Sequence, residues 1–233
     1  MNAAFVLVHS PSVGPSTWTP VAERLAAAGT TAVVPSLLGV ADGEPPAWPR
    51  VAQAVAAQIA LLPEGLPVVL VAHSNAGLFL PVIAQASPRP VAGFVFVDAG
   101  LPARDGLTPV APPQFLELLR GKAVDGRLPQ WTTWWDEADV APLFPDARTR
   151  AVVEAEQPRL PLSYYEQRIP APAGWDGRPC GYLLFDEDAY GEEASEAAGR
   201  GWTVDRLTGL HLHQLVDPDG VTARLTAMAG PWL

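Results

Sequence analysis

Short runs of consecutive apolar residues alternate along the chain with segments in which apolar residues recur at helical spacing. Because the runs are apolar at nearly every position, both faces of the sheet that they form are expected to be covered by helices. The alternation predicts an α/β fold with a mostly parallel sheet of about six strands. The predicted strands are Ala4–His9, Thr31–Pro35, Val68–Ala72, Gly93–Asp98, Gly181–Phe185 and Trp202–Leu207.

Helices are predicted between these strands. The first is expected to begin with Ser16 or Thr17 as its N-cap and to end at Gly29, because hydroxyl side chains favour helix starts and glycine favours helix ends. A third helix is expected to begin at Ser74 itself. The other predicted helices cover about 51–62, 189–199 and 218–228.

A long segment rich in proline and aromatic residues, about 101–179, separates the fourth and fifth predicted strands and has helical patterns over 113–120 and 146–156. Open α/β sheets bind ligands at the carboxyl ends of their strands, so an insertion at this point predicts a helical cap over a binding site. The chain is thus expected to be one domain, 1–233, with a core of 1–100 and 180–233. Its candidate pocket residues in the cap are Trp131, Trp134, Trp135 and Tyr164, although these aromatic residues could instead only pack the cap onto the core.

Composition narrows the possible partners. The 233 residues include 25 acidic and 15 basic side chains, a net charge of −10 that disfavours nucleic acid and anionic membrane surfaces. The apolar run near the start is too short for a membrane span or a signal peptide, so a cytoplasmic protein is expected. Cys180 is the only cysteine, and no Cys/His spacing typical of a metal site is present. A small-molecule substrate is expected, without metal or cofactor, and the oligomeric state stays open.

The third predicted strand runs directly into Ala72–Gly77, which is followed by a helical pattern. A strand, a sharp turn and a helix are the context of a nucleophile elbow, whose usual pattern is Gly-x-Ser-x-Gly. Here Ala72 and Ala76 replace the two glycines, and Gly77 follows immediately. Ser74 is therefore the candidate nucleophile. The alternative is that it serves only as a helix N-cap.

Two histidines near the end of the chain are candidates for the general base. His211 follows the last predicted strand and precedes a helix that starts at Pro218, as expected for the third member of a Ser, acid, His order. His213 competes for this role and otherwise contacts substrate or packs in the core. We expect His211 to take the proton from the serine.

The carboxylate that orients the base has two candidate positions. Asp98 ends a buried apolar strand, which is an unusual place for a charged residue. Asp188 lies after the next strand, in an acidic cluster with Asp186 and Glu187. Asp98 is the preferred acid and Asp188 the alternative, with Asp186 or Glu187 as lesser candidates.

Taken in order along the chain, these motifs resemble those of the α/β-hydrolase superfamily over essentially the whole sequence. The resemblance includes the small esterases of that superfamily and its plant methylesterase and hydroxynitrile lyase branch. The methylesterase branch places its acid where Asp188 falls, whereas some dehalogenase-like members place it where Asp98 falls. The resemblance therefore keeps both acids open. The segments that carry it are Phe5–Ser10, Trp18, Ala72–Gly77, Phe96–Asp98, Leu184–Asp188 and Gly209–Pro218.

The oxyanion loop departs from the pattern of the family. The usual sequence His-Gly-x supplies a backbone N–H from the third residue, but this chain has His9, Ser10 and Pro11, and proline has no N–H. A missing donor costs about 10² to 10³ in rate unless it is replaced. Asn75 is expected to supply one backbone N–H, and the hydroxyl of Ser10 or Ser12 is expected to supply the other hydrogen bond.

Together these features predict a serine hydrolase that cleaves a small or medium apolar ester, lactone or thioester through an acyl-enzyme. One alternative is a lyase or cyclase that uses the same residues, motivated by the altered oxyanion loop. Hydroxynitrile lyases, however, tend to have lysine where this chain has Leu212. A second alternative is a ligand-binding protein that keeps the hydrolase fold without catalysis.

Overall fold

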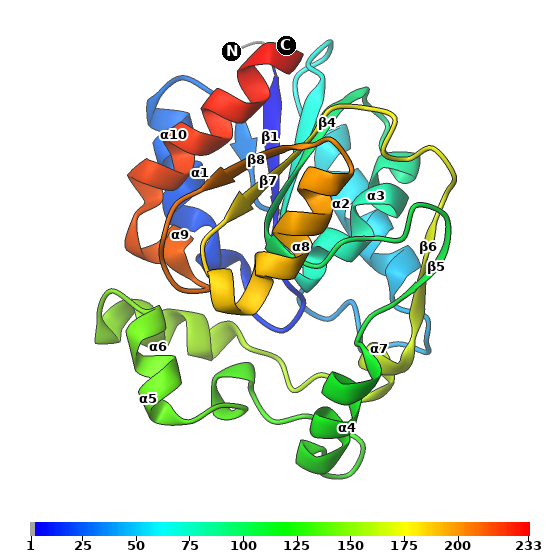
Figure 1. Ribbon diagram of the computed structural model, residues 1–233, viewed down its shortest axis with the longest axis vertical. Helices are drawn as coiled ribbons and strands as arrows, with labels where there is room; N and C mark the ends of the chain where they lie inside the picture. Colours follow the sequence, from blue (N-terminus) through cyan, green and yellow to red (C-terminus); the bar gives the residue numbers. More distant parts are fainter. Residues whose placement is uncertain (1–2) are drawn as a thin grey trace.

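The computed structural model describes residues 3–233, and its centre is a six-stranded parallel sheet (Figure 1). The strand order is β2-β1-β3-β4-β7-β8, so β3 and β4 lie in the middle and their carboxyl ends meet at the centre of one sheet edge. The predicted α/β fold is thereby confirmed. The strands are β1 (Ala4–Val8), β2 (Ala32–Val33), β3 (Val68–Ser74), β4 (Val91–Ala99), β7 (Cys180–Leu184) and β8 (Thr203–Arg206).

Helices cover both faces of this sheet (Figure 1). In β3, Val69 and Val71 belong to a core cluster shared with α1 and α10, whereas Leu70 belongs to a second cluster shared with α2, α3 and α8. Side chains of a strand alternate between its faces, so a continuous apolar run is what two buried faces require. These helices are α1 (Thr19–Ala27), α2 (Trp48–Ala60), α3 (Leu80–Ala86), α8 (Glu187–Gly199) and α10 (Pro218–Ala229).

The segment between β4 and β7, residues 100–179, is called the β4–β7 insertion below. Its helices lie together beyond one edge of the sheet (Figure 1). β5 and β6 pair with each other antiparallel, a small second sheet that the sequence did not predict. The elements of the insertion are β5 (Gly106–Pro109), α4 (Pro113–Lys122), α5 (Glu137–Val140), α6 (Ala147–Glu156), α7 (Ser163–Glu166) and β6 (Arg168–Ala171), with a 3₁₀ turn at Trp131–Thr133.

Two predicted helix starts were wrong in detail. Pro15–Thr17 forms a separate 3₁₀ turn, in which the Thr17 hydroxyl donates to the Gly14 carbonyl, so neither predicted residue caps α1. The helix expected at Ser74 begins one residue later, as the 3₁₀ segment Asn75–Phe79, and continues as α3. The predicted stop of the first helix at Gly29 is confirmed, since this glycine has a φ of 75°.

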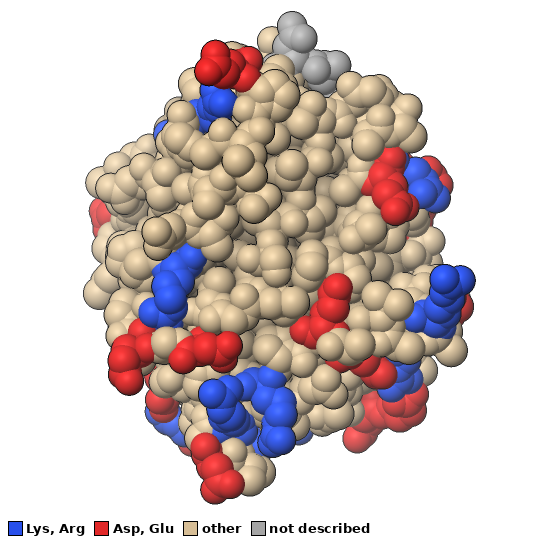
Figure 2. Space-filling model, turned by 180° about the vertical axis from the view of Figure 1, so that it is seen from behind, with Lys and Arg blue, Asp and Glu red and all other residues tan. Residues whose placement is uncertain are grey.

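Charged side chains are spread over the surface. On the face shown in Figure 2, basic residues lie close to acidic ones and do not gather into one patch. Within residues 3–233 no helix has the length and apolarity needed to cross a membrane.

Candidate active site

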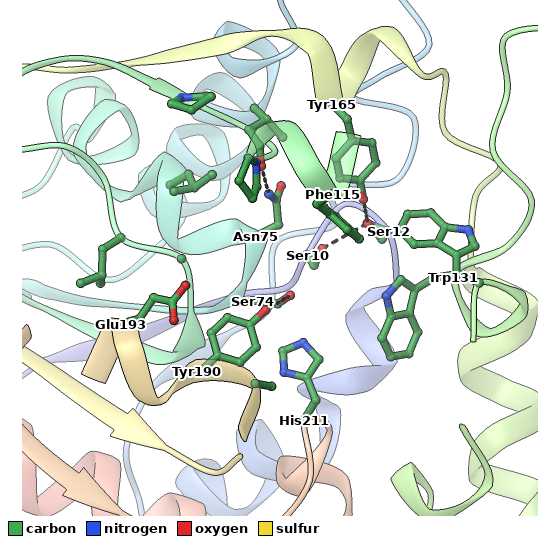
Figure 3. Close-up of a pocket in the computed structure, with 18 of the residues that line it drawn as sticks. Ser10, Ser12, Ser74, Asn75, Phe115, Trp131, Tyr165, Tyr190, Glu193 and His211 are labelled. Carbon is green, nitrogen blue, oxygen red and sulfur yellow. Dashed lines mark hydrogen bonds between the residues drawn. The ribbon is translucent and has the colours of Figure 1, made fainter. Parts of the chain in front are cut away.

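Ser74 stands at the turn between β3 and the following 3₁₀ segment, with φ 60° and ψ −134°. A non-glycine residue with positive φ is strained, and such strain is common at functional turns. The turn also brings two chain segments very close, because a Cβ on Gly77 would lie 2.4 Å from the Gly100 carbonyl oxygen. Only glycine fits at position 77. The tight turn directs Ser74 into a cavity at the carboxyl edge of the sheet (Figure 3).

Asn75 is held by the β4–β7 insertion. Its side-chain amide donates to the Val110 carbonyl at 3.1 Å, and its Oδ1 accepts a hydrogen bond from the Tyr164 hydroxyl. Its backbone N–H is the first of the 3₁₀ segment, where no preceding turn supplies an acceptor. This N–H is therefore available to a ligand beside Ser74.

A β-bulge places Asp98. The pairing of β3 with β4 joins His73 to Val97 and then Ser74 to Ala99, which leaves Asp98 outside the ladder with a φ of 40°. Bulges redirect a side chain and are frequent beside active sites. The fully buried Asp98 carboxylate accepts hydrogen bonds from the N–H groups at the end of β7: Phe185 at 2.6 Å and Asp186 at 3.3 Å.

The other carboxylate oxygen of Asp98 lies 3.4 Å from Nδ1 of His211. The His211 side chain is 15% exposed and lines the same cavity as Ser74. Burial lowers the pKa of His211 to about 4 and raises the pKa of Asp98 to about 7. The imidazole is therefore neutral above about pH 4, as a general base must be, and its carboxylate partner is charged above about pH 7.

His73 supports the loop that carries His211. Its Nε2 donates to the backbone carbonyl of His211 at 2.7 Å, and the two rings lie 4.4 Å apart. Burial lowers the pKa of His73 to about 3, so two adjacent cations do not form at neutral pH. His73 thus acts on the shape of the site from beneath it, as its place next to the serine in the sequence suggests.

Tyr190 of α8 is part of the site, although no sequence motif predicted it. Its hydroxyl lies 3.4 Å from the Ser74 hydroxyl, and its ring stacks on His211 with centroids 4.9 Å apart and planes 10° apart (Figure 3). Within residues 3–233 no hydrogen bond joins Ser74 to His211 directly. Such bonds are often long or poorly aligned before substrate binds.

The loop after β1 forms the opposite wall. The hydroxyl of Ser10 accepts the Ser12 N–H at 3.3 Å, which leaves its own hydrogen free to donate into the cavity that it lines. The Ser12 hydroxyl pairs with the Tyr165 hydroxyl at 2.5 Å. His9, beneath the loop, is bound to the Leu37 N–H and the Ser10 carbonyl. Pro11 lies in this turn without an N–H to offer.

The cavity has a volume of about 630 Å³, and the predicted residues Trp131, Trp134 and Trp135 line it. Tyr164 does not line it, because this buried ring points at the Asn75 side chain; the next residue, Tyr165, lines it instead. His213 is also outside the lining and packs against the ring of Phe185, 5.5 Å away.

The acidic cluster after β7 has a different role from an orienting acid. Asp186 caps α8 by accepting the N–H groups of Asp188 and Ala189. Asp188 is exposed in the first turn of that helix and does not contact His211. Of the two carboxylates considered, the structure brings only Asp98 to the histidine. Among residues 3–233, no three His, Cys, Asp or Glu side chains are grouped as a metal site requires.

The fold and this site together have the arrangement typical of α/β-hydrolases. The family model described as "Alpha/beta hydrolase family" matches residues 5–224, so the chain belongs to that family. No curated protein sequence matches it significantly.

Three solved structures illustrate the likeness in fold. Tomato methylketone synthase I is 13% identical, with a TM-score of 0.80, and the match covers 100% of this chain and 99% of that one. An extracellular α/β-hydrolase from a Paenibacillus species, described as a structural and functional homologue of tobacco salicylic acid binding protein 2, is 17% identical, with a TM-score of 0.75 and coverage of 97% and 98%. Polyneuridine aldehyde esterase is 15% identical, with a TM-score of 0.71 and coverage of 98% and 100%.

Proposed function

We propose that the protein is a serine hydrolase that transfers an acyl group to Ser74 and then to water. The observation that carries this proposal is the convergence of three groups on one cavity: a serine on a strained turn, a neutral buried histidine, and a buried carboxylate behind it. That is the constellation of an activated nucleophile, its base and the group that orients the base.

In the proposed mechanism the Ser74 hydroxyl leaves its contact with Tyr190 when substrate binds and transfers its proton to Nε2 of His211. The serine oxygen attacks the carbonyl carbon, and the imidazolium then protonates the leaving group. Asp98 stabilises the imidazolium through Nδ1. Water deacylates the enzyme by the same steps, with His211 again as base.

The tetrahedral intermediate needs hydrogen-bond donors for its oxyanion. The backbone N–H of Asn75 is one proposed donor, and the Ser10 hydroxyl replaces the N–H that Pro11 lacks. Ser10 is suited to this role because the Ser12 N–H orients its oxygen while its hydrogen remains available.

The substrate is proposed to be a small or medium ester, lactone or thioester with a substantial apolar part. The cavity lining is mainly apolar and aromatic, and no lysine or arginine is among the described residues that form it. A substrate carboxylate would find no cation there. The β4–β7 insertion would act as a cap that excludes water. Esterase and pyrethroid hydrolase activities named for proteins of similar fold are compatible with this proposal.

Pro11 favours one other candidate function, a lyase or cyclase that uses the same histidine and hydroxyl groups without an acyl-enzyme. A protein that binds ligand without catalysis is a further alternative, since the fold does not determine function. Both alternatives predict that ester cleavage is absent.

The test is hydrolysis of para-nitrophenyl esters of increasing chain length by the native protein and by Ser74→Ala and His211→Ala. The control is Ser195→Ala, which removes an exposed hydroxyl of α8 that bonds only to its own helix. We expect both site variants to lose about 10³-fold or more in kcat/KM and the control to keep it. Native protein without esterase activity, or unchanged activity in Ser74→Ala, would contradict the proposal.

A further inference from the structure

Glu193 is the only acidic residue, and His211 the only basic one, among the described residues that line the cavity. It lies on α8 three residues after Tyr190, a spacing that puts both side chains on the same face of the helix. Both residues line the cavity (Figure 3). Burial and nearby carboxylates, Glu192, Glu196 and Asp98, raise the pKa of Glu193.

The neighbours of Glu193 on the same helix show how an ordinary surface carboxylate behaves here. Glu187 pairs with Arg206, and Glu196 pairs with Arg200 at 2.5 Å. Among residues 3–233, no ion pair or side-chain hydrogen bond involves the Glu193 carboxylate. A half-buried carboxylate without a cationic partner is unfavourable, and a ligand that supplies a cation reduces this penalty.

The cavity offers aromatic rings on its other side. In Figure 3, Glu193 and Trp131 lie on opposite sides of Ser74. Trp131 is 6.2 Å from the His211 ring, and the stacked pair Phe115 and Trp135 also lines the cavity. An ester held over Ser74 would therefore extend one end toward the aromatic rings and the other toward the carboxylate.

We propose that the substrates of this site carry a cationic group, an ammonium, that binds at Glu193 while an apolar group on the other side of the scissile bond binds among the aromatic rings. This inference rests on the proposed hydrolase function and specifies its substrate class. Since His211 is neutral above about pH 4, Glu193 is the one fixed charge among the described residues that line the cavity.

The first test compares para-nitrophenyl esters whose acyl chain ends in a trimethylammonium group or in its uncharged tert-butyl isostere. A second pair of esters, assayed by acid release, has the same two groups on an alkyl alcohol part in place of para-nitrophenol. We expect native protein at about pH 8 to favour the cationic member of at least one pair by about tenfold in kcat/KM, the order expected for a partly screened ion pair. Glu193→Gln should bring this ratio close to one.

Glu192→Gln is the matched control, because this exposed residue is adjacent in sequence and does not line the cavity. It should keep the native ratio. Active native protein without preference for the cationic esters, or an unchanged ratio in Glu193→Gln, would overturn the inference and leave the hydrolase proposal intact.

A binding measurement separates the inference from catalysis. Benzyltrimethylammonium is titrated into the protein while the fluorescence of the cavity tryptophans is followed. We expect Glu193→Gln to bind about tenfold more weakly than native protein and Glu192→Gln to bind equally well. If the native protein shows this binding pattern but has no esterase activity, the hydrolase proposal is rejected and the cation site is kept. Equal affinities in native protein, Glu193→Gln and Glu192→Gln would reject the cation site.

Discussion

Replacing Asp98 by asparagine isolates the contribution of the buried carboxylate. Asparagine can still accept the Phe185 and Asp186 N–H groups through Oδ1. Its NH₂ group, however, would face Nδ1 of His211 and donate where the carboxylate accepts. His211 would then carry its proton on Nε2, the nitrogen that must accept the proton of Ser74. We therefore expect kcat to fall by about 10⁴.

The same substitution should change how stability depends on pH. The pKa of Asp98 rises from 3.8 to about 7 on burial, so the folded carboxyl group holds its proton more tightly than the unfolded one. The native protein therefore loses stability as pH rises from about 4 to about 7, by at most about 4 kcal/mol. Asparagine does not titrate, so the variant should lack this loss and be more stable than native protein above about pH 7.

The assays are ester hydrolysis and urea unfolding between about pH 5 and pH 9. The native rate should rise through about pH 7, because Asp98 becomes charged there while His211 is already neutral. Asp188→Asn serves as the control and should match native protein in both assays, since its side chain is exposed. Native kcat in Asp98→Asn, or an equal loss in Asp188→Asn, would refute the assignment.

Substitutions at three further positions, each with a comparison variant, test other parts of the account. Ser10→Ala should lower kcat by about 10² to 10³, because its hydroxyl is proposed to bind the oxyanion. Ser12→Ala, measured with the same ester, should lower kcat far less. Equal losses in the two variants would argue against Ser10 as an oxyanion donor. Tyr190→Phe should change kcat by less than about tenfold. Tyr190→Ala removes the ring stacked on His211 and should lower kcat by about tenfold or more. A loss of more than about tenfold in Tyr190→Phe would show that the hydroxyl itself is required. Gly77→Ala should destabilise the protein by about 1 to 3 kcal/mol in thermal denaturation, because its Cβ meets a backbone oxygen at 2.4 Å. Gly121→Ala in α4 places its new Cβ more than 4 Å from any atom outside the local helix backbone and should not be destabilised. Similar losses in both variants would contradict the packing argument.

The sequence predicted the sheet well because its strands are buried on both faces. In β3, every residue from Val68 to His73 is buried, and a run of this kind is visible without knowledge of its neighbours. The antiparallel pair β5 and β6 was missed because Gly106–Pro109 is short, partly exposed and paired with a segment about sixty residues away. Nothing local marks such a pairing.

The positions of site residues could be predicted where a characteristic residue type falls at a predicted turn. They could not be predicted where the packing of distant segments determines which side chains meet. Ser74 and His211 follow strands and lead into helices, so their positions are legible in the sequence. The position of Asp98 depends on a bulge in the pairing of β3 with β4, which is a property of the register of two distant strands. Tyr190 and Tyr165 enter the site because of where α8 and α7 lie in the fold, which neither residue's own sequence neighbourhood determines.

The most direct measurement of the central claim is the intact mass of the protein after incubation with a fluorophosphonate, followed by peptide mapping. The account predicts one adduct per native chain, located on Ser74, lost in Ser74→Ala and formed far more slowly in His211→Ala. No adduct on native protein, or an adduct that persists in Ser74→Ala, would contradict the claim that this cavity holds an activated serine.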